Sequence, residues 1–95
     1  METKEMQIFK AHGFDEQLKK LAEEQFELIE ALLTYRIGVG LSSSETRKHV
    51  AEEMADCLVL MEQFRQRLDI SQDEIKKWYD MKVDRELERI KAAEQ

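Results

Sequence analysis

The stretch AEEQFELIE, residues 22–30, combines acidic and apolar residues with the spacing of an amphipathic helix. A second stretch, AEEMADCL at residues 51–58, repeats the arrangement. Acids three residues apart project side by side from a helix, so each stretch predicts a pair of carboxylates next to an apolar stripe. Two such helices packed together would bring four carboxylates into one small volume. The rest of the chain can be read as a frame for these two helices.

The first of these helices is expected from about Asp15 to Arg36. With about 100° per residue and Glu24 at zero, its apolar stripe covers roughly 40–180° and Glu27 lies near 300°. Both acids are therefore expected at one edge of the stripe, half turned toward the core. The residues that share this face are Leu18, Leu21, Gln25, Leu28, Ile29 and Leu32.

The second acidic helix is expected from about Ser43 to Leu68. With Glu53 at zero, its apolar stripe covers roughly 20–140° and Asp56 lies near 300°. The second acid pair is thus predicted to stand in the same relation to its core face as the first. The stripe consists of Val50, Met54, Cys57, Leu58, Met61, Phe64 and Leu68.

Glycine and polar residues predict where the first helices begin and end. A short helical pattern in residues 1–12 is expected to stop at Gly13, and Asp15 is expected to cap the helix that follows. Residues 38–44 form the one glycine- and serine-rich segment of the sequence. That segment is interpreted as a loop within one domain.

Two further helix starts are predicted by capping boxes, in which a serine precedes a glutamate by three residues. The pairs are Ser42 with Glu45 and Ser71 with Glu74. The second box begins a last helix that reaches toward Gln95. Its apolar stripe consists of Ile75, Tyr79, Val83, Leu87 and Ile90.

The composition favours a single all-α domain over residues 1–95. Apolar residues make up 42% of the chain and charged residues 38%, and there is no proline to interrupt helices. Ninety-five residues are near the lower limit for a self-sufficient core. We therefore expect a small bundle of about four helices that is completed by homo-oligomerisation.

The net charge and the cysteine content restrict the partners and the compartment. The formal net charge is −6, so the chain as a whole has no electrostatic attraction to polymeric nucleic acid or to an anionic membrane. Cys57 is the only cysteine, which excludes an intrachain disulfide and fits a reducing cytoplasm. No apolar run resembles a secretion signal or approaches membrane-spanning length.

The four acids have two interpretations. Charged residues three or four apart usually belong to a solvated helix face. Against that interpretation, the residues four positions after the acids are not basic, so the carboxylates would repel one another beside a core unless a cation neutralised them. Oxygen ligands favour Mg²⁺ or Mn²⁺, while a zinc site and a di-iron Glu-x-x-His site lack their ligands in this sequence. The four following residues are Leu28, Ala31, Cys57 and Leu60.

A basic flank on the last helix also has two interpretations. Lys82, Arg85 and Arg89 follow one another at spacings of three and four. They can be a solvated basic helix end, with Arg85 paired to Glu86 or Glu88. Alternatively, they form a strip that binds phosphate oxygens through arginine forks and a lysine charge.

These motifs together resemble those of the MazG-like all-α nucleotide pyrophosphohydrolases. The family's EExxE…ExxD signature is matched by residues 23–27 and 53–56, and its flanks by residues 13–18, 35–36 and 82–90. The resemblance implies an all-helical homodimer or homotetramer that uses Mg²⁺ to cleave a nucleoside triphosphate. In the final segment, this chain has Asp84 and Glu86 where related patterns often carry asparagine.

Site roles follow from the resemblance, position by position. It implies that Glu23 or Glu52 would help to orient the attacking water. Lys82 and Arg85 would face the phosphates, with Arg89 on the same flank. The metal ligands would be Glu24, Glu27, Glu53 and Asp56.

The leading hypothesis from the sequence is therefore a Mg²⁺-dependent nucleoside triphosphate pyrophosphohydrolase, with Mn²⁺ as a possible substitute. The alternative is a non-catalytic helical module for oligomerisation or protein binding, in which the acids are only solvated. A related all-α phosphohydrolase that acts on another nucleotide is a third hypothesis within the enzyme class. The preferred base and sugar are not predicted.

Overall fold

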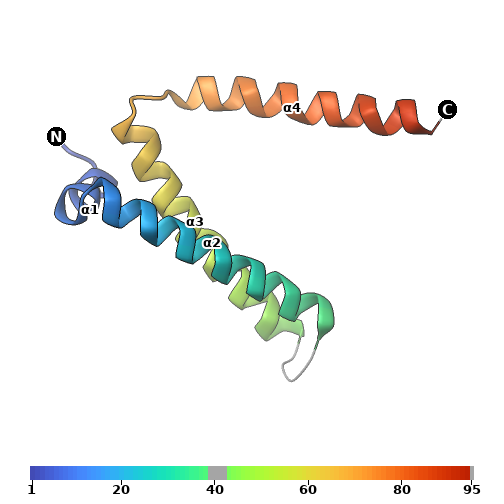
Figure 1. Cartoon of the computed structure of the whole chain (residues 1–95), viewed down its shortest axis with the longest axis horizontal. Helices are drawn as coiled ribbons and strands as arrows, with labels where there is room; N and C mark the ends of the chain where they lie inside the picture. Colours follow the sequence, from blue (N-terminus) through green and yellow to red (C-terminus); the bar gives the residue numbers. More distant parts are fainter. Residues whose placement is uncertain (39–42, 95) are drawn as a thin grey trace.

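The computed structural model describes residues 1–38 and 43–94, which form four α-helices and contain no strand (Figure 1). This confirms the predicted all-α class with four helices. None of these helices is long and apolar enough to cross a membrane. The helices are α1 (Lys4–His12), α2 (Phe14–Ile37), α3 (Ser43–Arg67) and α4 (Gln72–Ala93).

Gly13 separates α1 from α2. Its φ of 92° lies in the region that favours glycine, and its N–H donates to the carbonyl of Phe9, which ends α1 as predicted. The prediction that Asp15 caps α2 is wrong. The helix begins at Phe14 with Gly13 at the N-cap position, so Asp15 already lies in the first turn, where its charge favours the positive end of the helix dipole.

Helices α2 and α3 form an antiparallel hairpin (Figure 1). Their contact is a narrow seam whose residues recur at steps of three or four, the pattern of helices packed knobs into holes. We call these residues the α2–α3 seam. They are Gln17, Leu21, Glu24, Leu28 and Ala31 from α2, and Thr46, Val50, Glu53, Cys57, Leu60 and Gln63 from α3.

The seam runs through the acids and not beside them, which corrects the predicted position of the core face. Glu24 and Glu53 are buried, whereas much of both predicted apolar stripes is exposed. A single hairpin can bury only one narrow strip of each helix, and the small side chains of Ala31 and Cys57 on that strip permit close approach. The exposed members of the predicted stripes include Leu18, Ile29, Leu32, Met54, Leu58, Met61 and Leu68.

Three aromatic rings hold α1 against the hairpin. Phe9 is buried and packs edge to face on Phe14 and Phe64, with ring centroids 6.0 and 5.4 Å away. Phe14 and Phe64 meet in the same geometry at 5.2 Å. Edge-to-face contacts add to the apolar burial of such rings. Phe9 is the only one of the three rings that is buried, so it lies at the centre of this cluster.

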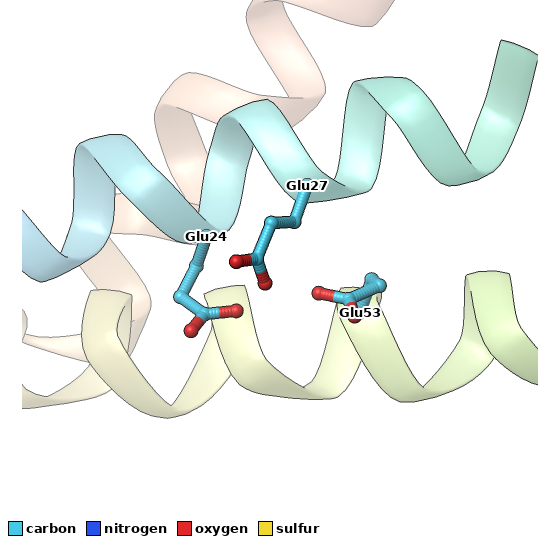
Figure 2. Close-up of side chains that lie close together, drawn as sticks. All are labelled: Glu24, Glu27 and Glu53. Atoms are coloured by element: carbon cyan, nitrogen blue, oxygen red, sulfur yellow. The ribbon is translucent and has the colours of Figure 1, made fainter.

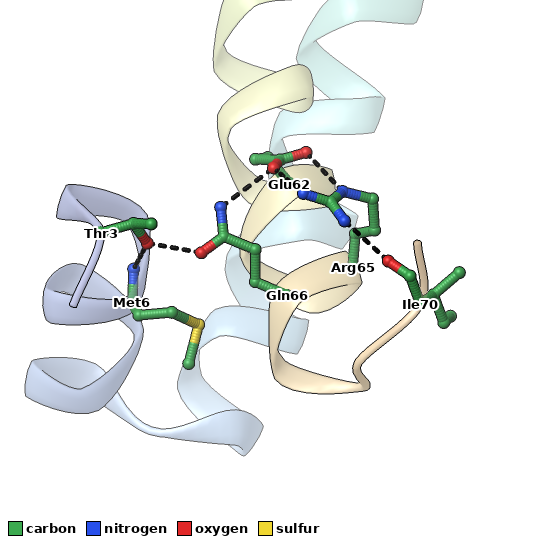
Figure 3. A network of polar contacts seen from close by, with 6 residues as sticks. All are labelled: Thr3, Met6, Glu62, Arg65, Gln66 and Ile70. Atoms are coloured by element: carbon green, nitrogen blue, oxygen red, sulfur yellow. Dashed lines mark hydrogen bonds and ion pairs between the residues drawn. The ribbon is translucent and has the colours of Figure 1, made fainter. Parts of the chain in front are cut away.

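A polar network connects α1 to the joint between α3 and α4 (Figure 3). Arg65 donates to both carboxylate oxygens of Glu62, at 3.0 and 2.5 Å, and to the carbonyl of Ile70 at 2.7 Å. Gln66 donates to Glu62 and accepts from the Thr3 hydroxyl. The bonds from Arg65 and Gln66 lower the pKa of Glu62 to about 2.

Helix α4 leaves this joint and packs against no other helix of the described chain (Figure 1). Its start is capped as predicted, because the N–H of Glu74 donates to the Ser71 hydroxyl at 3.0 Å. The other predicted box involves Ser42, which lies outside the described residues. The radius of gyration is 17.1 Å, against about 12 Å for a compact chain of this length. A single chain therefore does not close its four helices into one bundle.

The aromatic cluster predicts a large stability loss on truncation. Replacing Phe9 by alanine should lower the free energy of unfolding by about 3–5 kcal/mol, because the ring is buried against two others. Phe14→Ala is the matched control, since the Phe14 ring is exposed on one side and should cost clearly less. Urea denaturation at one protein concentration measures both. Equal losses would contradict the proposed role of Phe9 as the centre of the cluster.

Candidate metal centre

The α2–α3 seam brings one glutamate from each helix to its middle. Glu24 is 6% exposed and Glu53 is 9% exposed, which is unusual for charged side chains. Glu27 lies one turn after Glu24 and is exposed, and its carboxylate points toward the other two (Figure 2). One carboxylate oxygen from each of the three residues lies within 4.8 Å of the others. We call these three residues the acidic cluster.

Each buried glutamate has one oxygen without a partner. Oε2 of Glu24 and Oε2 of Glu53 are inaccessible to solvent and accept no hydrogen bond from the described residues. Burying a carboxylate without a compensating interaction costs several kcal/mol, so such groups are normally paired or bound to a metal. Carboxylate oxygens converging from two helices are suitable ligands for a hard divalent cation such as Mg²⁺ or Mn²⁺. The donor set therefore fits the ion that the sequence predicts.

The two buried carboxylates have opposite electrostatic surroundings. Lys20 lies 3.1 Å from Glu24, and this hydrogen-bonded ion pair holds the pKa of Glu24 below its usual value. Burial raises the pKa of Glu53, and the charges of Glu27, Asp56 and Glu24 raise it further. Glu24 thus stays ionised, whereas Glu53 has only His49 nearby, at 3.9 Å, and its effect on the pKa is smaller than that of burial and the neighbouring carboxylates.

A basic residue one turn before each buried acid was missed by the sequence analysis. Lys20 pairs with Glu24 from four positions before it, and His49 approaches Glu53 at 3.9 Å in the same way. The expectation that the acids lack basic neighbours is therefore wrong for Glu24. The i,i+4 spacing was available as a signal in both cases.

The other predicted acids lie around the cluster. Asp56 is exposed and does not belong to the group of three, but it lines a cavity together with Glu23 and Glu24. Glu23 is also exposed at that cavity. Glu52 lies on the outer side of α3 and pairs with Lys48 at 3.9 Å. The structure thus brings together three of the four predicted metal ligands and places Asp56 one turn away.

The predicted phosphate strip is separate from the acids within one chain. Lys82, Arg85 and Arg89 are exposed on α4, which contacts no other helix in the part of the chain that is described. Arg89 lies 3.5 Å from Glu86, a local pairing of the kind expected for a solvated helix face. These residues can reach an acidic cluster only if α4 meets another chain or changes its position.

The cavity beside Glu24 has a volume of about 490 Å³ and lies between α1, α2 and α3. Its walls include Ile8 and Val59 as apolar residues, and Gln17 and Gln63 as buried amides. Both glutamines were missed as candidates. Gln17 precedes Glu24 by seven residues, a heptad spacing that would have placed it on the same face.

Comparisons with protein-family models, with curated proteins and with solved structures find no match for this chain.

The raised pKa of Glu53 predicts how the metal-free protein responds to pH. As pH rises above the ordinary glutamate value of 4.5, the folded chain binds more protons at Glu53 than the unfolded chain, so stability falls. Glu53→Gln should remove this loss and raise the melting temperature by a few degrees at pH 7 in EDTA, with little change at pH 4. Thermal melts at both pH values measure the difference.

Glu24→Gln is the matched control for that measurement. Its pKa is lowered by Lys20, so its ionised form contributes stability above pH 4.5 that falls away as the pH drops through the lowered value. The Gln variant should therefore gain no stability at pH 7. An equal gain in both variants would show that general charge reduction, and not the position of Glu53, sets the stability.

Proposed function

We propose that this chain is a Mg²⁺-dependent nucleoside triphosphate pyrophosphohydrolase of the MazG-like kind, acting in the cytoplasm. It would cleave a (d)NTP to the monophosphate and pyrophosphate. The observation that carries the proposal is the pair of buried oxygens, Oε2 of Glu24 and Oε2 of Glu53, without hydrogen-bond donors among the described residues. Packing alone does not explain two carboxylates at the centre of a helix seam.

The acidic cluster would hold the ion through Glu24, Glu27 and Glu53, with Asp56 as a further ligand within one helical turn. Bound Mg²⁺ would supply charge neutralisation at the phosphate oxygens and a bound water of lowered pKa. Lys20 keeps Glu24 ionised and therefore ready to act as a ligand. The exposed carboxylate of Glu23, at the wall of the cavity, would orient the attacking water and accept its proton.

Homo-oligomerisation, as a dimer or tetramer, belongs to the same proposal. Helix α4 has 22 residues and packs against no other helix of the described chain, although helices in proteins gain most of their stability from packing. Association would cover its apolar side chains and those left outside the α2–α3 seam. It would also allow Lys82, Arg85 and Arg89 of one chain to approach the phosphates at the acidic cluster of another. The apolar side chains of α4 are Ile75, Trp78, Tyr79, Met81, Val83, Leu87 and Ile90.

A non-catalytic interaction module remains the second candidate function. The exposed apolar side chains of α2, α3 and α4 favour it, since large exposed apolar surfaces mark interaction sites. It leaves the buried oxygens of Glu24 and Glu53 without a purpose. For that reason the pyrophosphohydrolase is preferred.

The activity is tested with a panel of NTPs and dNTPs in Mg²⁺, measuring monophosphate and pyrophosphate together. Glu53→Ala and Glu24→Ala should each lower pyrophosphate release by at least about 100-fold, because each removes a metal ligand. Both variants should keep the helical circular dichroism signal. Glu88→Ala on exposed α4 is the matched control and should retain activity.

Three outcomes would count against the proposal. No release from any nucleotide by the wild-type chain would contradict the activity. Diphosphate plus orthophosphate as products would contradict the bond proposed to break. Unchanged melting temperatures on addition of Mg²⁺ or Mn²⁺ would contradict metal binding, since an ion that binds only the folded state must stabilise it.

The oligomer is tested by light scattering after gel filtration. The wild-type chain should elute with two or four times the chain mass of 11.3 kDa. Leu87→Glu should weaken assembly, because it places a charge among the apolar side chains of α4. Lys91→Gln changes the net charge by the same amount and should leave the assembly intact. A monomeric wild-type chain would contradict this part of the proposal.

A further inference from the structure

The cavity beside the acidic cluster contains a buried amide pair that the proposed reaction does not use. Gln17 from α2 is 5% exposed and Gln63 from α3 is 1% exposed, and both line the cavity. Nε2 of Gln17 donates to Oε1 of Gln63 at 2.8 Å. Gln63 is the most deeply buried large side chain of the described residues. The pair therefore spans the seam at the floor of the cavity.

This bond satisfies only part of the hydrogen-bonding capacity of the two amides. A glutamine side chain has two N–H donors and a carbonyl acceptor. Among the described residues, neither the side-chain oxygen of Gln17 nor the amino group of Gln63 has a further hydrogen-bond partner. Both groups are accessible to solvent. The pair therefore presents one acceptor and one amino group to the cavity. Reversing both amides also leaves one free acceptor and one free amino group at the cavity.

The position of the pair matches a ligand whose other end is at the acids. Gln17 precedes Glu24 by seven residues, or roughly 10 Å along α2. Gln63 follows Asp56 by the same interval on α3. The cavity wall includes Gln17 and Gln63 together with Glu24 and Asp56, whereas Glu27 and Glu53 line a neighbouring pocket. An extended nucleotide with its phosphates at the acids would place its base near the amides.

A purely structural role for the pair explains less. Two amides could clamp α2 to α3, but apolar side chains of the same size would do so without placing a polar donor and acceptor at the cavity wall. Neighbouring Leu60 shows that the seam accommodates apolar side chains at this level. The unused donor and acceptor point to a polar ligand.

We propose that Gln17 and Gln63 form the subsite that recognises the nucleobase. This inference rests on the proposed pyrophosphohydrolase function and adds its specificity determinant. An acceptor beside a donor complements a base edge that presents an adjacent donor and acceptor. The apolar walls from Ile8 and Val59 would contact the faces of the base. The substrate would then be selected by hydrogen bonds at one end of the cavity and cleaved at the other.

The test compares Gln17→Met and Gln63→Met with the wild-type chain. The values of kcat/KM are measured for dNTPs with each of the four bases, and for a sugar triphosphate without a base. Each variant should lose about 10- to 100-fold on the preferred nucleotide, because a buried hydrogen bond is left unmade. The preference among bases should flatten, while hydrolysis of the base-free substrate should stay unchanged.

The double variant Gln17→Met/Gln63→Met controls for folding. Replacing both partners by apolar side chains of similar size leaves no amide buried without its partner, so this variant should fold even if a single variant does not. Its preference among the bases should be as flat as in the single variants. Circular dichroism and melting temperature establish that it is folded.

The outcomes separate this inference from the activity on which it rests. If the wild-type chain is active and the variants keep its base preference, the subsite is wrong. It is also wrong if the variants lose the base-free substrate to the same degree. If the wild-type chain cleaves nothing, the proposed function fails. The subsite is then tested separately by calorimetric titration with the four dNMPs in Mg²⁺. Base-dependent binding that the variants lose would support the subsite, and its absence would overturn it.

Discussion

The burial of Glu24 and Glu53 in the α2–α3 seam is the constraint on which the rest of the structure depends, because burying two carboxylates costs free energy. Two carboxylates in such a position repel each other and lose their hydration. Lys20 compensates one of them, and nothing among the described residues compensates the other to the same extent. A positive charge bound beside these carboxylates would therefore stabilise the hairpin.

Much of the fold could be predicted from the sequence, because helix starts and stops depend on local chemistry. Gly13 ends α1 and Ser71 caps α4 for reasons contained within a few residues. The prediction that Asp15 caps α2 was wrong. A cap immediately precedes the first helical residue, and Phe14 already belongs to the helix. Which face of a helix is buried is a different matter. That depends on the partner helix, and both stripes in this chain were wide enough to permit more than one answer.

In the candidate site, too, local features were predicted and features that depend on a partner helix were not. The acids of the cluster were predicted because spacing along one helix is encoded locally. The nearly complete burial of Glu24 and Glu53 was not predicted, because both were expected at the edge of the apolar stripe and only half turned toward the core. Gln17 and Gln63 were missed because the meaning of each depends on the other, 46 residues away in the sequence. The sequence also does not predict what covers the apolar side chains of α4, because no other described helix packs against them.

A few bonds at the joint after α3 determine the direction of α4 and therefore the position of its far end. Asp69 has a φ of 55°, a left-handed conformation that aspartate tolerates better than most residues, and Arg65 fixes the carbonyl of Ile70 next to it. Helix α4 is about 33 Å long, so a 10° rotation at this joint would move its far end by about 6 Å. A small change at Arg65 would therefore cause a large displacement at the far end of α4. The positions of Lys82, Arg85 and Arg89 relative to the hairpin therefore depend on this joint, which lies more than ten residues before the first of them.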